Sequence, residues 1–132
     1  MGINELSQEI HQNAVEHGWW ETPPSFPEII ALCHSELSEA LEEYRSGKKN
    51  LYYECPFHDT RSNCPDRYDG CQHGKNKGCN QRKPEGIGIE LADCVIRIID
   101  YCAHAGIDLE EMIRIKHEYN KTRSYKHGGK KI

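Results

Sequence analysis

Apolar residues recur at helical spacing in separate stretches of the chain, and the first stretch lies at its start. Residues 3–17 carry an apolar residue every three or four positions, and Gly18 follows as a stop signal. We therefore predict a first helix over residues 3–17. Its apolar positions are Ile3, Leu6, Ile10, Ala14 and Val15.

The second stretch has the clearest boundaries. Ser25 stands three residues before Glu28, which is the spacing of a capping box, and Gly47 is placed to end the helix. Pro23 and Pro24 forbid helix immediately before it and make the preceding segment a connector. The predicted helix carries one apolar stripe, formed by Phe26, Ile30, Cys33, Leu37, Leu41 and Tyr44.

Two more helices are predicted in the second half of the chain. From Ile87 to Gly106 the sequence is apolar on nearly every face, which suits a helix at the centre of a bundle. Asp108 then caps a fourth helix, with Glu111 three residues later. We expect the fourth helix to bury an apolar face made of Leu109, Met112, Ile113, Ile115 and Tyr119.

Residues 48–85 interrupt the helical pattern. They are rich in Gly, Pro, Asn, Asp and charged residues and carry four of the seven cysteines, so we interpret them as an inserted loop or small module. Alternation typical of strands is nowhere sustained, and the whole chain contains only two valines. The prediction is a single all-α domain over residues 1–132, a four-helix bundle with a Cys/His-rich insert at 48–85 and a basic tail at 124–132.

Length and charge narrow the class of protein. A chain of 132 residues with 36% hydrophobic and 29% charged residues suits one folded domain. No apolar run approaches the roughly 20 residues of a membrane span, and the N-terminus lacks the pattern of a signal peptide, so we expect a cytoplasmic protein away from membranes. The net charge of −4 is segregated, with residues 1–47 acidic and 112–132 basic, which argues against a nucleic-acid-binding protein.

Two pairs of carboxylates are spaced to project from helix faces. Glu36 and Glu39 are three residues apart on the second predicted helix, and Glu90 and Asp93 repeat that spacing on the third. If the four converged, their repulsion would require a cation, and hard oxygen ligands suit Mg²⁺. Two plainer interpretations stay open. The first pair could belong to a solvated acidic face, and Asp93 could form an intrahelical ion pair with Arg97.

These residues, together with a later motif, resemble a known family. The pattern Glu36-x-x-Glu39, Glu90-x-x-Asp93 and Lys116-x-x-x-Asn120-x-x-Arg123 resembles the MazG-type all-α nucleoside triphosphate pyrophosphohydrolases and is similar to the dimeric dUTPases and dCTP pyrophosphatases. The likeness also includes Gly18-Trp19-Trp20. One departure is the spacing between the two acidic motifs, which is about fifty residues here and shorter in the family.

The resemblance implies a fold, an activity and roles for individual residues. It implies a dimer or tetramer that cleaves a nucleoside triphosphate to the monophosphate and pyrophosphate with Mg²⁺, for which Mn²⁺ can substitute. Glu36, Glu39, Glu90 and Asp93 would hold the metal and act in catalysis. The substrate-binding residues would be Lys116, Asn120, Arg123 and Trp20, with one of the two tryptophans stacking on the base and the other anchoring the fold.

The insert allows a second metal. Its thiols and imidazoles are of the types that bind Zn²⁺, although their spacing follows no regular pattern; unligated thiols and disulfides are the alternatives. The candidate ligands are Cys55, His58, Cys64, Cys71, His73 and Cys79. Cys33, Cys94 and Cys102 lie on predicted helices, where we expect small buried hydrophobes. Two rival functions also stay open, a zinc-knuckle nucleic-acid-binding module and a non-catalytic helical interaction protein.

Overall fold

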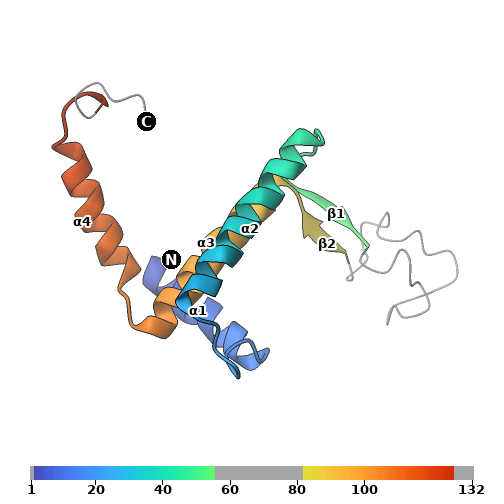
Figure 1. Ribbon diagram of the computed structural model, residues 1–132, viewed down its shortest axis with the longest axis horizontal. Helices are drawn as coiled ribbons and strands as arrows, with labels where there is room; N and C mark the ends of the chain where they lie inside the picture. Colours follow the sequence, from blue (N-terminus) through green and yellow to red (C-terminus); the bar gives the residue numbers. More distant parts are fainter. Residues whose placement is uncertain (1, 56–81, 127–132) are drawn as a thin grey trace, which may run out of the picture. The chain divides into compact units, whose positions relative to one another are not determined.

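The computed structural model describes residues 2–55 and 82–126, which are mostly helical. The four predicted helices are present, and two short strands lie between the second and the third (Figure 1). In chain order the elements are α1 (Ile3–Glu16), α2 (Phe26–Arg45), β1 (Tyr52–Glu54), β2 (Lys83–Glu85), α3 (Ile87–Ala105) and α4 (Leu109–Lys121).

The helix boundaries follow from local capping chemistry. The Ser25 Oγ accepts a hydrogen bond from the backbone N–H of Glu28 at 3.3 Å, and the Asp108 carboxylate accepts one from Glu111 at 3.0 Å. Such side chains satisfy N–H groups that the first turn of a helix leaves without partners. Gly47 follows α2 with φ +71°, a conformation that ends a helix at little cost in glycine. The predicted caps of the second and fourth helices are therefore confirmed.

The two strands correct the prediction for the insert. β1 pairs with β2 in antiparallel register, with Tyr52 opposite Glu85 and Glu54 opposite Lys83 (Figure 1). We expected an inserted loop or small module over residues 48–85 and no strands, and the absence of strands is wrong for the two ends of the segment. Strands of three residues are too short to show a period of two, and their partners are distant in sequence.

By contacts, the chain divides into two compact units. The first contains residues 2–29 and 96–126, and the second contains residues 30–55 and 82–95. In the first unit the start of α1 is bound to the start of α4. The Ile3 N–H donates to the Glu110 carboxylate at 3.0 Å, and the Asn4 amide donates to the Asp108 carboxylate at 3.1 Å.

The buried face of α2 is not the predicted apolar stripe. Of the stripe residues only Cys33 is buried, whereas Leu37 and Leu41 are about half exposed and Tyr44 is more so. The residues of α2 that are buried lie further round the helix and include an acid: Ile29, Cys33, Glu36 and Ala40. The apolar periodicity correctly groups residues that share a helix face. It does not predict which face is buried within a single chain.

The predicted buried face of α4 is also wrong for the chain alone. Leu109 is partly covered, but Met112, Ile113, Ile115 and Tyr119 are each about half exposed. On α3, which we expected to be central, Leu91 and Val95 are exposed as well. By contrast, Cys33, Cys94 and Cys102 are buried, as expected.

Candidate metal centre

Carboxylates from α2 and α3 lie together in the second unit. One oxygen each from Glu36, Glu39 and Glu90 falls within 4.8 Å of the other two. Glu36 and Glu39 are three residues apart, so the helix presents both toward one side. Glu36 is only 7% exposed and Glu90 only 8%, while Glu39 reaches the surface.

Burial and repulsion change the acidity of this cluster. Burial, a hydrogen bond to Glu39 and the charges of Glu39, Asp93 and Glu85 raise the pKa of Glu90 to about 7. Below about pH 7 the Glu90 carboxyl is therefore mostly neutral, and its O–H can donate a hydrogen bond to Glu39. A proton shared between two carboxyls is a common response to like charges held close together, and a divalent cation would relieve the same repulsion.

Asp93, the fourth predicted ligand, lies half-buried one turn after Glu90. It falls outside the group of three within 4.8 Å, but its charge is among those that raise the pKa of Glu90. All four predicted metal ligands therefore lie near one another, and three of them, Glu36, Glu39 and Glu90, form the closest group.

A second group of carboxylates shares Glu90. One oxygen each from Glu43, Glu85 and Glu90 lies within 4.8 Å of the other two. Glu43 is on α2, and Glu85 is on β2 at the end of the insert. The Tyr52 hydroxyl on β1 donates to both oxygens of Glu43 at 2.9 Å. Partial burial and the Glu43 carboxylate raise the pKa of Tyr52 to about 12, so the hydroxyl remains a donor throughout the physiological range.

A lysine faces this second group. The Lys83 Nζ lies 2.9 Å from Glu85 Oε1, and its side chain is 63% exposed. The hydrogen bond and charge of Glu85, followed by the charges of Glu90 and Asp93, raise the pKa of Lys83. The ammonium is therefore a positive charge held against the acidic cluster by the hairpin.

The hairpin is tied to the start of α3 by backbone contacts. The Ile87 N–H donates to the Lys49 carbonyl at 3.1 Å, and the Gly88 N–H donates to the Asn50 carbonyl at 3.0 Å. Gly86 has φ +124°, and a Cβ there would lie 2.5 Å from the Asn50 oxygen. Only glycine permits this approach. The tie fixes Glu85 beside Glu90.

Sequence reasoning missed Glu85, Tyr52 and Lys83. Glu85 is separated from the acidic helix motifs by the irregular insert, and no local pattern marks it. The Tyr52 and Lys83 side chains reach the cluster only through strand pairing, which a sequence without sustained alternation does not predict.

The donor set fits a hard divalent cation. The oxygens come from carboxylates only, two of the three residues are buried, and the raised pKa of Glu90 reflects a repulsion that a cation would relieve. Carboxylate oxygens suit Mg²⁺ and Mn²⁺, whereas Zn²⁺ sites are usually built with His or Cys.

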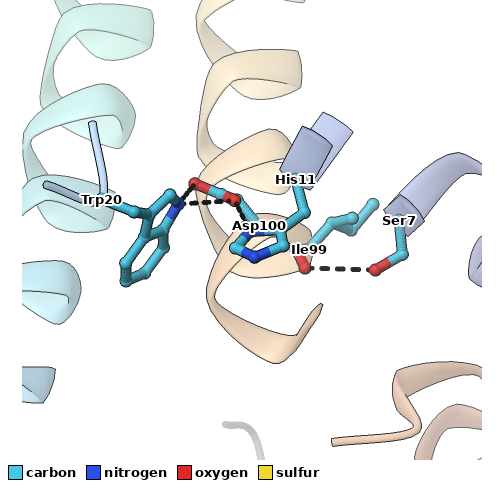
Figure 2. A network of polar contacts seen from close by, with 5 residues as sticks. All are labelled: Ser7, His11, Trp20, Ile99 and Asp100. Atoms are coloured by element: carbon cyan, nitrogen blue, oxygen red, sulfur yellow. Dashed lines mark hydrogen bonds and ion pairs between the residues drawn. The ribbon is translucent and has the colours of Figure 1, made fainter. Parts of the chain in front are cut away.

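Trp20, predicted to contact substrate, belongs to a polar and aromatic network in the first unit (Figure 2). Its indole N–H lies 3.1 Å from both Asp100 oxygens, and the same carboxylate lies 2.7 Å from His11 Nδ1. The Trp20 ring stacks on His104 with centroids 4.0 Å apart. Trp19 is largely exposed. These contacts give Trp20 an anchoring role in its unit.

The other predicted substrate residues lie on α4 and just after it. The Lys116 ammonium and the Arg123 guanidinium both lie over the ring of Tyr119, at 4.9 Å and 5.8 Å from its centroid. Asn120 is exposed between them in sequence. The three polar side chains therefore share the C-terminal end of one helix.

Most of the predicted zinc ligands lie outside the described residues. Cys55, the residue after β1, is buried. The others fall in the segment 56–81, namely His58, Cys64, Cys71, His73 and Cys79. The zinc site stays a prediction, and residues 127–132 of the basic tail also lie outside the described part.

Comparison with known protein families, with characterised proteins and with solved structures finds no match to this chain. Among the helices in residues 2–55 and 82–126, none has the length and apolar character needed to cross a membrane.

Proposed function

We propose that the protein is a divalent-cation-dependent nucleoside triphosphate pyrophosphohydrolase that acts in the cytoplasm. The observation that carries the proposal is the meeting of Glu36, Glu39 and Glu90 within 4.8 Å, with two of the three buried. Buried ionised carboxylates are costly unless a cation or a proton compensates them. The geometry suggests a metal site, and the resemblance of the sequence motifs to the MazG-type enzymes suggests the reaction.

The chain's own residues divide into two roles in this proposal. Glu36, Glu39, Glu90 and Asp93 would hold Mg²⁺, or Mn²⁺ in its place. Bound there, the ion would supply positive charge against the phosphate oxygens and make a nearby water more acidic. Phosphoryl transfer depends chiefly on such positioning and charge neutralisation.

The second role is recognition of the triphosphate. Lys116 and Arg123 carry the positive charges proposed to contact phosphate, and Arg123 can do so with two parallel hydrogen bonds. Asn120 would contact phosphate or sugar. Trp20 would contact the base only with the face of its ring that is turned away from His104, while Asp100 holds the indole N–H.

We also propose that the working form is a homo-oligomer, a dimer or a tetramer. Its support is the exposure of large apolar side chains on α2, α3 and α4, among them Leu41, Val95 and Ile115. Apolar side chains left exposed on a helix are typical of a surface that a second subunit covers.

The deciding experiment incubates the protein with a panel of ribo- and deoxyribonucleoside triphosphates and Mg²⁺. We expect pyrophosphate rather than orthophosphate as the product. In Glu39→Gln we expect turnover to fall by roughly a hundred- to a thousandfold, the loss typical of removing one group that stabilises charge in the transition state. Glu42→Gln is the matched control, because Glu42 is exposed on the same helix and pairs with Arg45. Full activity in Glu39→Gln, or no pyrophosphate from any triphosphate, would refute the proposal.

A further inference from the structure

The fourth helix presents an apolar face that carries two positive charges. Met112, Ile115 and Tyr119 are spaced three and four residues apart, so they share one side of α4, and each is about half exposed. The Lys116 ammonium and the Arg123 guanidinium lie over the Tyr119 ring, at 4.9 Å and 5.8 Å from its centroid. These five residues together form one surface, the cationic face of α4.

The cations elsewhere on α4 are balanced within the helix. Arg114 lies 2.6 Å from Glu111, and Lys121 lies 2.8 Å from Glu118. By contrast, neither cation of the cationic face forms an ion pair with a carboxylate in the described part of the chain. A surface that covers the cationic face must therefore be apolar and must also supply negative charge, because buried cations without partners are costly.

The apolar stripe of α2 meets both requirements. Leu37, Leu41 and Tyr44 of this stripe are exposed in the single chain. The helix around them contains five glutamates, one arginine and no lysine, so it is strongly acidic. The lengths also agree, because the 13 residues of α4 span about 20 Å and the stripe from Ile30 to Tyr44 spans about 21 Å.

We infer that α4 packs with its cationic face on the α2 stripe of a second copy of this chain. In a twofold dimer this contact would occur twice, once for each α4, and would cover both exposed faces of each copy. Contacts between like helices fit the charges less well, because α4 on α4 would bring cations together and α2 on α2 would bring glutamates together. The inference rests on the proposed homo-oligomer and does not depend on the proposed reaction.

The first test places the photo-crosslinking residue benzoylphenylalanine at position 119, in a mixture of unlabelled and isotopically labelled chains. After irradiation and proteolysis, we expect crosslinked peptides that join α4 of one copy to α2 of the other and so combine both labels. The same probe at position 117, outside the cationic face, is the control and should give few such peptides. Crosslinks to other elements, crosslinks within one copy only, or no crosslinks would overturn the inference.

The second test compares two double variants that remove the same charge. Lys116→Gln with Arg123→Gln should raise the dissociation constant of the oligomer at least about tenfold, the scale expected for losing charge pairs at an interface. Arg114→Gln with Lys121→Gln is the matched control and should leave this constant unchanged. The two cations of the first variant are also proposed to contact phosphate, so sedimentation is measured without nucleotide.

Circular dichroism of both double variants must match the wild type, so that a loss of association is not a loss of helix. Equal dissociation constants in the two double variants would overturn the role of the cationic face.

The outcomes separate this inference from the proposed function. A wild-type chain that stays monomeric refutes both the homo-oligomer and this interface. An oligomer whose crosslinks avoid α2 refutes the interface alone. Pyrophosphate release from nucleotides is measured separately, so the proposed reaction is judged by its own experiment.

Discussion

Single residues at the acidic cluster determine how stability depends on pH. The pKa of Glu90 is about 7 in the folded chain, against an ordinary value of 4.5. Between these two values the folded chain holds a proton that the unfolded chain releases. The free energy of unfolding should therefore fall as pH rises from about 4.5 to about 7, with the full loss present above 7.

Glu90→Gln should abolish this dependence. Glutamine keeps the shape but has no proton to lose, so in EDTA at pH 8 the variant should be more stable than the wild type, by about 1–3 kcal/mol. Urea denaturation at pH 5 and pH 8 measures the difference. Glu42→Gln changes a side chain that is 70% exposed and screened by water, so this variant should keep the wild-type slope. The same slope in Glu90→Gln would show that Glu90 is not the group responsible.

At the scale of elements, the hairpin depends on one glycine. A Cβ at Gly86 would lie 2.5 Å from the Asn50 oxygen and 2.6 Å from the Lys49 oxygen, and the backbone there has φ +124°. Gly86→Ala should therefore displace the strand end or cost about 3 kcal/mol or more, since it adds a backbone clash to an unfavourable φ.

Gly47→Ala is the matched control for that substitution. Gly47 also has a positive φ, but a Cβ there would meet nothing within 4 Å. Gly47→Ala should lower the free energy of unfolding only by the cost of placing a side chain at positive φ, about 1 kcal/mol. Chemical denaturation of the two variants compares them directly, and equal costs would mean that the close approach at Asn50 is not maintained in solution.

The elements differ in how far the sequence predicts them, because the interactions that form them differ in range. Ser25 and Asp108 cap helices through bonds to residues three positions away, so their motifs were sufficient to place the helix starts. The hairpin brings Tyr52 opposite Glu85 across the whole insert, and no local pattern encodes that pairing. The acidic pairs were visible as motifs, but the position of Glu85 beside Glu90 required the fold.

At the scale of the whole molecule, the main feature is the apolar stripe of α2, most of which is exposed to solvent in the single chain. The stripe was predicted from its period, yet Leu37, Leu41 and Tyr44 remain exposed while Glu36 on a neighbouring face is buried. Large apolar side chains on a helix are usually buried. Because α2 buries Glu36 and exposes its leucines, its leucines would follow this rule only if another surface packed on them. We therefore expect the stripe to lie at the subunit interface of the proposed oligomer.

Leu41→Glu tests this assignment. Leu41 is 57% exposed in the single chain, so a glutamate there should leave an isolated subunit folded. In an oligomer the same carboxylate would be buried against apolar side chains without a partner, at a cost of several kcal/mol. The dissociation constant of the assembly should therefore rise by at least about a hundredfold. Sedimentation velocity over a range of concentrations measures the shift, with circular dichroism to verify the helices. Val15→Glu, a similarly exposed position on α1, should leave the assembly intact. A wild-type chain that sediments as a monomer, or a Leu41→Glu variant that assembles as the wild type does, would remove the stripe from the interface.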